Sequence, residues 1–182
     1  MHPLHKVVSD AITEANLPDC TVVKEPACGG NQRIPLFCSA ENSRHTEYCN
    51  VDMLVLASNR VKVIVEIEEA TITPIQVYGK FLASALSSFF IHEYKNDVPI
   101  EMNHSVLFTQ ILDTSKLKRN KTAKMKQWRN IERSIQNVIP LEGNRIDHYK
   151  LFYRNSNDFE LGGAERNKLV DYIRPFFAKA SN

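Results

Sequence analysis

The alternation of apolar and polar positions predicts two neighbouring strands in the first half of the chain. Residues 51–56 (VDMLVL) and 61–68 (VKVIVEIE) are rich in β-branched and aliphatic residues, and the short polar link ASNR joins them. This pattern is typical of a β-hairpin. Residues 33–39 are ambiguous, and residues 40–48 are expected to form a polar connection. Further strands are predicted at 20–25, 104–112 and 147–154.

Apolar residues spaced three and four apart predict helices around these strands. The first covers residues 3–16 and ends before Pro18. The second begins with Thr73 as N-cap and Pro74 as its first residue, and it is expected to run to about residue 93. We expect it to bury a continuous apolar stripe, made of Tyr78, Phe81, Leu82, Ala85, Leu86, Phe89 and Phe90.

The C-terminal third of the chain adds two more predicted helices, one within 114–139 and one after the Gly162-Gly163 turn. Together these elements predict an α/β fold with a mixed central β-sheet flanked by helices. The chain has 182 residues, of which 43% are hydrophobic, enough to bury a sizeable core. We therefore expect residues 1–182 to form a single domain.

Composition narrows the class of protein only a little. No segment reaches the roughly 18 apolar residues that a membrane-spanning helix needs, and the N-terminal stretch does not have the pattern of a signal peptide. The four cysteines lie too far apart for zinc half-sites, so we expect reduced thiols and a cytoplasmic protein. Lys and Arg number 23 against 21 for Asp and Glu, so any case for nucleic acid depends on where the charges lie.

Three carboxylates on the predicted hairpin point to a metal site. Glu66 and Glu68 share one face of their strand, because side chains alternate with a period of two. If the partner numbers of the hairpin add to an even value, Asp52 lies opposite or diagonal to Glu66. Carboxylates gathered in this way repel one another unless a cation compensates them, and oxygen ligands suit Mg²⁺, with Mn²⁺ also acceptable. The alternative is the solvated end of an edge strand.

The strand with Asp52, the short turn and the apolar strand ending in Glu66-Ile67-Glu68 before a helix resemble the signature of the PD-(D/E)XK nuclease superfamily. Its best-known members are type II restriction endonucleases. The likeness covers residues 3–112, whose predicted αβββαβ order also fits the superfamily. Residues 113–182, with the basic helix and the last strand and helix, lie outside it. Glu68 occupies the usual Lys position, so the chain resembles the E-x-E variant of the motif.

The resemblance implies a Mg²⁺-dependent endodeoxyribonuclease with a restriction-endonuclease-like fold. Asp52, Glu66 and the carbonyl of Ile67 would bind the metal, and Glu68 would orient or deprotonate the attacking water. The cation that Glu68 replaces would come from Lys80 on the following helix. Lys62 is a less favourable source, and the upstream carboxylate that often assists would be one of Glu14, Glu41 and Glu47.

A run of positive charge lies at the start of the helix predicted within 114–139. Residues 116–129 contain no acidic residue and seven basic ones: Lys116, Lys118, Arg119, Lys121, Lys124, Lys126 and Arg129. Such a run neutralises phosphates, so we predict that it binds double-stranded DNA beside the metal site. A solvated helix face is the alternative interpretation.

Cleavage of both DNA strands would need two sites, which predicts a homodimer. Its contact would be the small-residue face of helix 75–91 or the C-terminal helix. Two other functions remain open on the sequence: a non-catalytic nucleic-acid-binding protein on a nuclease scaffold, and a small globular protein whose carboxylates bind no metal.

Overall fold

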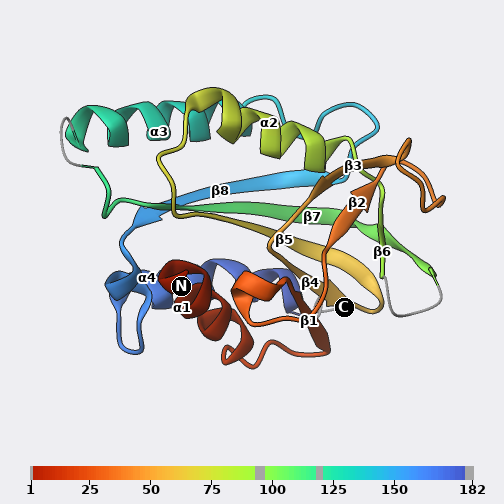
Figure 1. Ribbon diagram of the computed structural model, residues 1–182, viewed down its shortest axis with the longest axis horizontal. Helices are drawn as coiled ribbons and strands as arrows, with labels where there is room; N and C mark the ends of the chain where they lie inside the picture. The colour runs from red at the N-terminus through yellow and green to blue at the C-terminus, as the bar shows by residue number, and fades with distance from the viewer. Residues whose placement is uncertain (1, 93–96, 118–120, 179–182) are drawn as a thin grey trace.

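The computed structural model describes residues 2–92, 97–117 and 121–178. Within these residues, eight strands form one mixed sheet, and four α-helices cover it, two on each face (Figure 1). The predicted fold class, an α/β fold with a mixed central sheet flanked by helices, is therefore confirmed. None of the helices in the described ranges is long and apolar enough to cross a membrane.

The predicted hairpin consists of β4 (Met53–Ala57) and β5 (Arg60–Glu68), which pair antiparallel. Its turn places Ser58 and Asn59 at φ values of 49° and 57°, the left-handed region that hairpin turns of this kind require. The outer neighbour of β4 is β1 (Cys20–Lys24), also antiparallel.

The register of this hairpin decides whether the carboxylates meet. Met53 pairs with Val65 and Leu54 with Ile64, so the partner numbers have an even sum. Continued by one residue beyond β4, this register brings Asp52 to the level of Glu66. The pairing on which the carboxylate prediction depended is confirmed.

The long strand β7 (Pro99–Asp113) connects the two halves of the sheet. Its second half runs parallel to β5 on one side and to β8 (Ile146–Arg154) on the other. Its first residues pair antiparallel with β6 (Phe89–Ile91). The carboxyl ends of β5, β7 and β8 consequently lie at the same edge of the sheet (Figure 1).

Two short strands complete the sheet where the sequence was ambiguous or suggested a polar connection. They are β2 (Pro35–Phe37) and β3 (Glu47–Asn50), which pair with each other, while β2 also pairs with β6. The connection predicted over residues 40–48 was therefore wrong at its C-terminal end. The backbone polar groups of these segments are satisfied by strands far away in sequence, which local patterns do not reveal.

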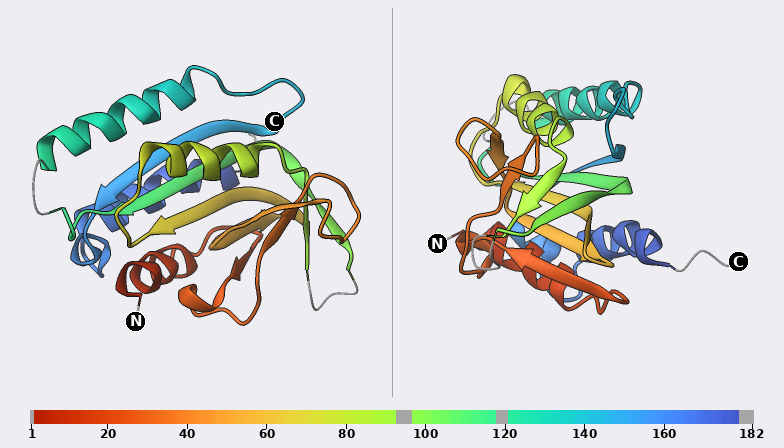
Figure 2. Two further views of the ribbon diagram at one scale, coloured as in Figure 1. Left: turned by 45° about the horizontal axis from the view of Figure 1, so that its top comes forward. Right: turned by 90° about the vertical axis from the view of Figure 1, so that its right-hand side faces the viewer.

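The helices divide between the two faces of the sheet, as Figure 2 shows from two further directions. Helices α1 (Pro3–Thr13) and α4 (Ala164–Ile173) pack on one apolar cluster, and α2 (Pro74–Ala85) and α3 (Lys121–Gln136) pack on the other. Three short 3₁₀ helices connect other elements: η1 (Pro26–Cys28), η2 (Ser156–Phe159) and η3 (Arg174–Phe177).

Helix α2 differs from its prediction in both length and orientation. It ends at Ala85 rather than near residue 93, because Phe89 and Phe90 belong to strand β6. Its buried residues are Val77, Phe81, Ser84 and Ala85, whereas three members of the predicted stripe are exposed: Tyr78 (36%), Leu82 (47%) and Leu86 (54%). Because α2 is apolar around most of its circumference, its sequence period alone could not select the buried face.

Candidate functional site

Glu66 is the most deeply buried carboxylate at the end of β5. It is 1% exposed, and it faces α2, from which Lys80 donates a hydrogen bond to its Oε2 at 2.8 Å. Burial raises the pKa of Glu66 to about 8, and the negative charge of Asp52 adds to the rise, while Lys80 opposes it. The cost of burying the charge therefore outweighs the attraction of the Lys80 ammonium.

Lys80 contacts both carboxylates that the sequence placed on this face. Its ammonium group forms ion pairs with Glu66 and Glu68. Burial disfavours the charged form of Lys80, but the two carboxylates outweigh it and raise the pKa of Lys80 above its ordinary value. Lys62, the less favoured source of a cation, lies elsewhere, where it donates to the carbonyl of Ser105 at 3.0 Å.

Asp52 lies directly before β4 and is fixed by two partners. Its Oδ2 accepts the backbone N–H of Ile67 at 2.6 Å, and its Oδ1 lies 3.8 Å from Nε2 of His5 on α1. Burial opposes ionisation of this carboxyl group, but the nearby imidazole of His5 and the hydrogen bond from Ile67 prevail and hold the pKa of Asp52 below its ordinary value. Asp52 is therefore held in its ionised form beside a buried glutamate whose pKa is raised.

Glu25 is a fourth acidic residue at this site, and the sequence analysis missed it. It follows β1, its N–H donates to the carbonyl of Asp52 at 3.0 Å, and ligand atoms of Glu25, Asp52 and His5 lie within 4.8 Å of one another. Burial raises the pKa of Glu25, and the charge of Asp52 raises it further. The antiparallel pairing of Lys24 with Met53 places Glu25 beside Asp52, so the strand order would have found it.

The upstream carboxylates suggested by the sequence do not join this cluster. Glu14 pairs with Arg166 at 2.7 Å, and Glu47 pairs with Arg33 at 2.8 Å. Glu41 is exposed in the connection between β2 and β3. The prediction of these three was wrong because the resemblance indicates only that an upstream carboxylate assists, whereas the pairing of strands decides which one reaches Asp52.

Carboxylate oxygens of the kind that Mg²⁺ and Mn²⁺ prefer lie around Asp52. Among the described residues, Asp52 shares a group of ligand atoms within 4.8 Å with Glu25 and His5, and neither Glu66 nor Glu68 belongs to such a group. Glu66 would have to turn towards Asp52 to share an ion with it, and the main-chain carbonyl of Ile67 lies between Glu66 and Glu68 in the chain. The buried Glu66 shares the one positive charge of Lys80 with Glu68, so the cluster holds more acidic groups than that charge balances. A divalent cation would remove this imbalance.

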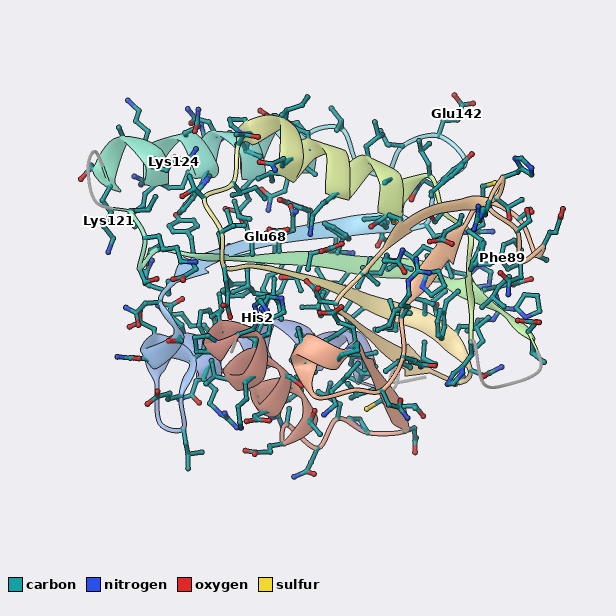
Figure 3. The ribbon with its side chains drawn as sticks, in the orientation of Figure 1. His2, Glu68, Phe89, Lys121, Lys124 and Glu142 are labelled. Atoms are coloured by element: carbon teal, nitrogen blue, oxygen red, sulfur yellow. The ribbon has the colours of Figure 1, made fainter. Side chains whose placement is uncertain are left out.

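The basic run lies at the N-terminal part of α3, on the same face of the sheet as α2. Lys116, Lys121, Lys126 and Arg129 are exposed. Lys124 is partly exposed, donates to Gln127 at 2.9 Å and lies 5.9 Å from the ring centre of Trp128. Lys118 and Arg119 lie outside the described residues. Figure 3 shows Lys121 and Lys124 at the start of α3, above the edge of the sheet at which the parallel strands end.

Comparison of the chain with protein-family models, with curated proteins and with solved structures finds no match in any of the three. Function must therefore be inferred from the side chains themselves. They form a partly buried cluster of carboxylates with a bridging lysine, at the end of a sheet whose neighbouring helix is basic.

Proposed function

We propose that the protein is a Mg²⁺-dependent endonuclease that hydrolyses DNA phosphodiester bonds in the manner of type II restriction enzymes. The observation that carries this proposal is the position of Lys80, which contacts both Glu66 and Glu68. In the E-x-E variant that the chain resembles, the usual lysine of the motif is replaced by Glu68. Lys80 brings an ammonium group to the same place from α2.

Each residue of the cluster has a role in this reaction. Asp52, Glu66 and the carbonyl of Ile67 would hold Mg²⁺, with Glu25 beside Asp52; bound there, Mg²⁺ would lower the pKa of a water molecule and neutralise charge on the phosphate. Glu68, 16% exposed at its side chain, orients the attacking water and accepts its proton. When substrate enters, Lys80 donates to a phosphate oxygen and stabilises the charge that develops there.

The basic face of α3 supports DNA as the substrate. Lys121, Lys126 and Arg129 are exposed, and α3 and α2 pack on the same face of the sheet. A duplex that contacts α3 through its phosphates extends towards the carboxylate cluster, which Lys80 of α2 borders. Contacts of this kind give affinity that does not depend on sequence.

The exposed apolar face of α2 supports a homodimer. Ile75, Leu82 and Leu86 are 75%, 47% and 54% exposed, and their spacing places them along one side of the helix. Gly79 lies beside them, with no atom within 4 Å of the position that a Cβ would occupy. Two copies of this face can pack around a twofold axis and so present two catalytic sites to the two DNA strands. The contact proposed here is the exposed apolar side of α2, since Ser84 of the small-residue face is buried.

A specific observation also favours the second function, a nucleic-acid-binding protein without catalysis. Lys80 already pairs with Glu66 and Glu68, so the cluster is partly neutralised without any metal. A protein that kept this arrangement only for stability would bind DNA through α3 and would not cut it.

Cleavage of plasmid DNA separates the two functions. We expect wild-type protein to cut with Mg²⁺ or Mn²⁺ and not with EDTA, and we expect Glu66→Gln to lose at least about 100-fold in rate. Glu101→Gln is the matched control, since Glu101 is an exposed carboxylate at the start of β7 that pairs with Arg60. DNA binding with no cutting under any metal would refute the nuclease and support the binding scaffold.

A further inference from the structure

A second group of potential metal ligands lies on the other side of His5, at the start of α1. His2 is the N-cap residue of α1, and His5 lies one turn later on the same side of the helix. Glu69, the residue directly after β5, completes the group, and ligand atoms of the three residues lie within 4.8 Å of one another. His5 also belongs to the group with Glu25 and Asp52 described above, whereas His2 and Glu69 do not.

The spacing of these atoms is that of a tetrahedral metal site. Nδ1 of His2 lies 3.6 Å from Oε2 of Glu69, and Nδ1 of His5 lies 3.2 Å from Oε1. Two ligands at about 2.0–2.1 Å from a tetrahedral Zn²⁺ are about 3.3 Å apart. The two separations lie on either side of that value, although they involve the two different oxygens of Glu69. Because the ligand atoms of all three residues lie within 4.8 Å of one another, rotation of the side chains would bring the three residues around one ion.

Glu69 and His5 are both held in place by further contacts. Oε1 of Glu69 accepts the backbone N–H groups of Leu4 and His5, at 2.6 Å and 3.1 Å, which orients its Oε2 towards His2. Nε2 of His5 faces Asp52 at 3.8 Å, while Nδ1 faces Glu69. A histidine that binds a metal through one nitrogen commonly points the other at a carboxylate, and this contact fixes its orientation.

We propose that His2, His5 and Glu69 bind a divalent transition metal of the Zn²⁺ type. Two imidazoles and one carboxylate suit Zn²⁺, Co²⁺ or Ni²⁺, whereas Mg²⁺ prefers a site made of oxygen atoms alone. The side chain of His2 is 61% exposed, so water can occupy the fourth position. The bound ion ties the first turn of α1 to the end of β5. This proposal does not depend on nuclease activity.

Zinc binding to the full chain, measured by competition with a chromophoric chelator, tests the proposal. A large excess of Mg²⁺ competes for the carboxylate oxygens around Asp52, and His2 and Glu69, which are not in the group of His5, Glu25 and Asp52, assign the zinc to one of the two sites. We expect one Zn²⁺ per chain, and at least a tenfold loss of affinity in both His2→Ala and Glu69→Gln. His45→Ala, which removes an exposed histidine outside the group, should bind as wild type does.

Two further measurements make the outcome decisive. His2→Ala should keep the wild-type circular dichroism and melting temperature in EDTA, because His2 is exposed, so its loss of zinc is not a loss of fold. Co²⁺ bound to wild type should give the intense visible absorption of a tetrahedral ion, and His2→Ala should lack it. Absence of zinc binding in wild type, or equal affinity in wild type and His2→Ala, would overturn the proposal. Glu66→Gln should still bind Zn²⁺, so failure of the nuclease proposal would be seen separately.

Discussion

The buried Glu66 makes the stability of the metal-free protein depend on pH in a definite direction. Its pKa rises from 4.5 to about 8 on folding. Between these values the folded chain keeps a proton that the unfolded chain releases, so the free energy of unfolding falls as pH rises. The stabilisation is complete below pH 4.5, and it is lost as pH passes through about 8. The variant Glu66→Gln carries a neutral amide of similar shape and has no such dependence.

The size of the effect follows from the same two values. At about 1.4 kcal/mol for each unit of pKa, a rise from 4.5 to about 8 corresponds to roughly 4 kcal/mol as an upper limit. We therefore expect Glu66→Gln to gain stability over wild type by up to this amount as pH increases across the range. His5, Asp52 and Glu69 also titrate, but their contributions are common to both proteins and cancel to first order in the difference.

Urea denaturation of both proteins in EDTA, from pH 4 to pH 9, measures this difference. Repeating it at the highest pH with Mg²⁺ adds a second check. Wild type should regain stability, by about 2.7 kcal/mol when Mg²⁺ is at 100 times its dissociation constant, and Glu66→Gln should regain much less. A difference between the proteins that stays constant over the whole pH range would refute the reasoning, because it would mean that burial does not hold a proton on Glu66.

Three sets of substitutions test the remaining roles. Lys80→Ala should slow plasmid cleavage by about 100-fold or more while Lys80→Arg retains part of the rate, because the role requires a positive charge at that point; equal rates for all three proteins would contradict it. Removing both Lys126 and Arg129 should reduce the slope of log K against log salt, in fluorescence anisotropy with duplex DNA, by about 0.9 for each lost phosphate contact; an unchanged slope would place the DNA elsewhere. Leu82→Glu should convert a dimer into a monomer in analytical ultracentrifugation, whereas Leu161→Glu, at an 86% exposed position away from α2, should not; a wild-type monomer, or the same result for both variants, would argue against the α2 contact.

The hairpin and its register could be predicted because their signals are local, whereas the ligand atoms of Asp52 group with those of His5 and Glu25 rather than with those of Glu66 and Glu68. Alternating β-branched residues and a short polar link specify β4 and β5, and Thr73-Pro74 specifies the start of α2. An even register then brings Asp52 and Glu66 to the same level. Lys80 reaches Glu66 and Glu68 because α2 follows β5 directly and packs over the same face. Whether these residues catalyse a reaction stays a prediction.

The features that the sequence patterns did not predict depend on contacts between segments that are distant in the chain. Strands β2 and β6 have three residues each, and they exist because Leu36 pairs with Phe90 across the sheet. Glu25 reaches Asp52 only through the pairing of β1 with β4. His5, which belongs to the polar remainder of an amphipathic helix by sequence, meets Asp52 and Glu69 only once α1 packs at the end of β5.

The prediction of which face of α2 is buried failed for a different reason. Phe81 packs edge-on against Phe108 and Tyr149, with ring centres 5.9 Å and 5.7 Å apart. Those partners lie on β7 and β8. Packing against these two strands therefore determines that Phe81, rather than its apolar neighbours on α2, is buried. Leu82 and Leu86 have the hydrophobicity of core residues and are nevertheless exposed.

The pairing of β7 with β5 on one side and β8 on the other limits which truncations and substitutions the fold can accept. The last third of the chain supplies β8, which covers one edge of β7, and also Leu169 and Ile173, which complete the apolar cluster under α1. A fragment that ended at residue 112 would expose a hydrophobic edge strand and invite aggregation. Helix α3 precedes β8 in the chain, so a truncation that removes α3 also removes the strand that covers this edge of β7. Substitutions on α3 that preserve the fold are confined to its outer face, because its inner face buries Trp128, Ile131 and Ile135.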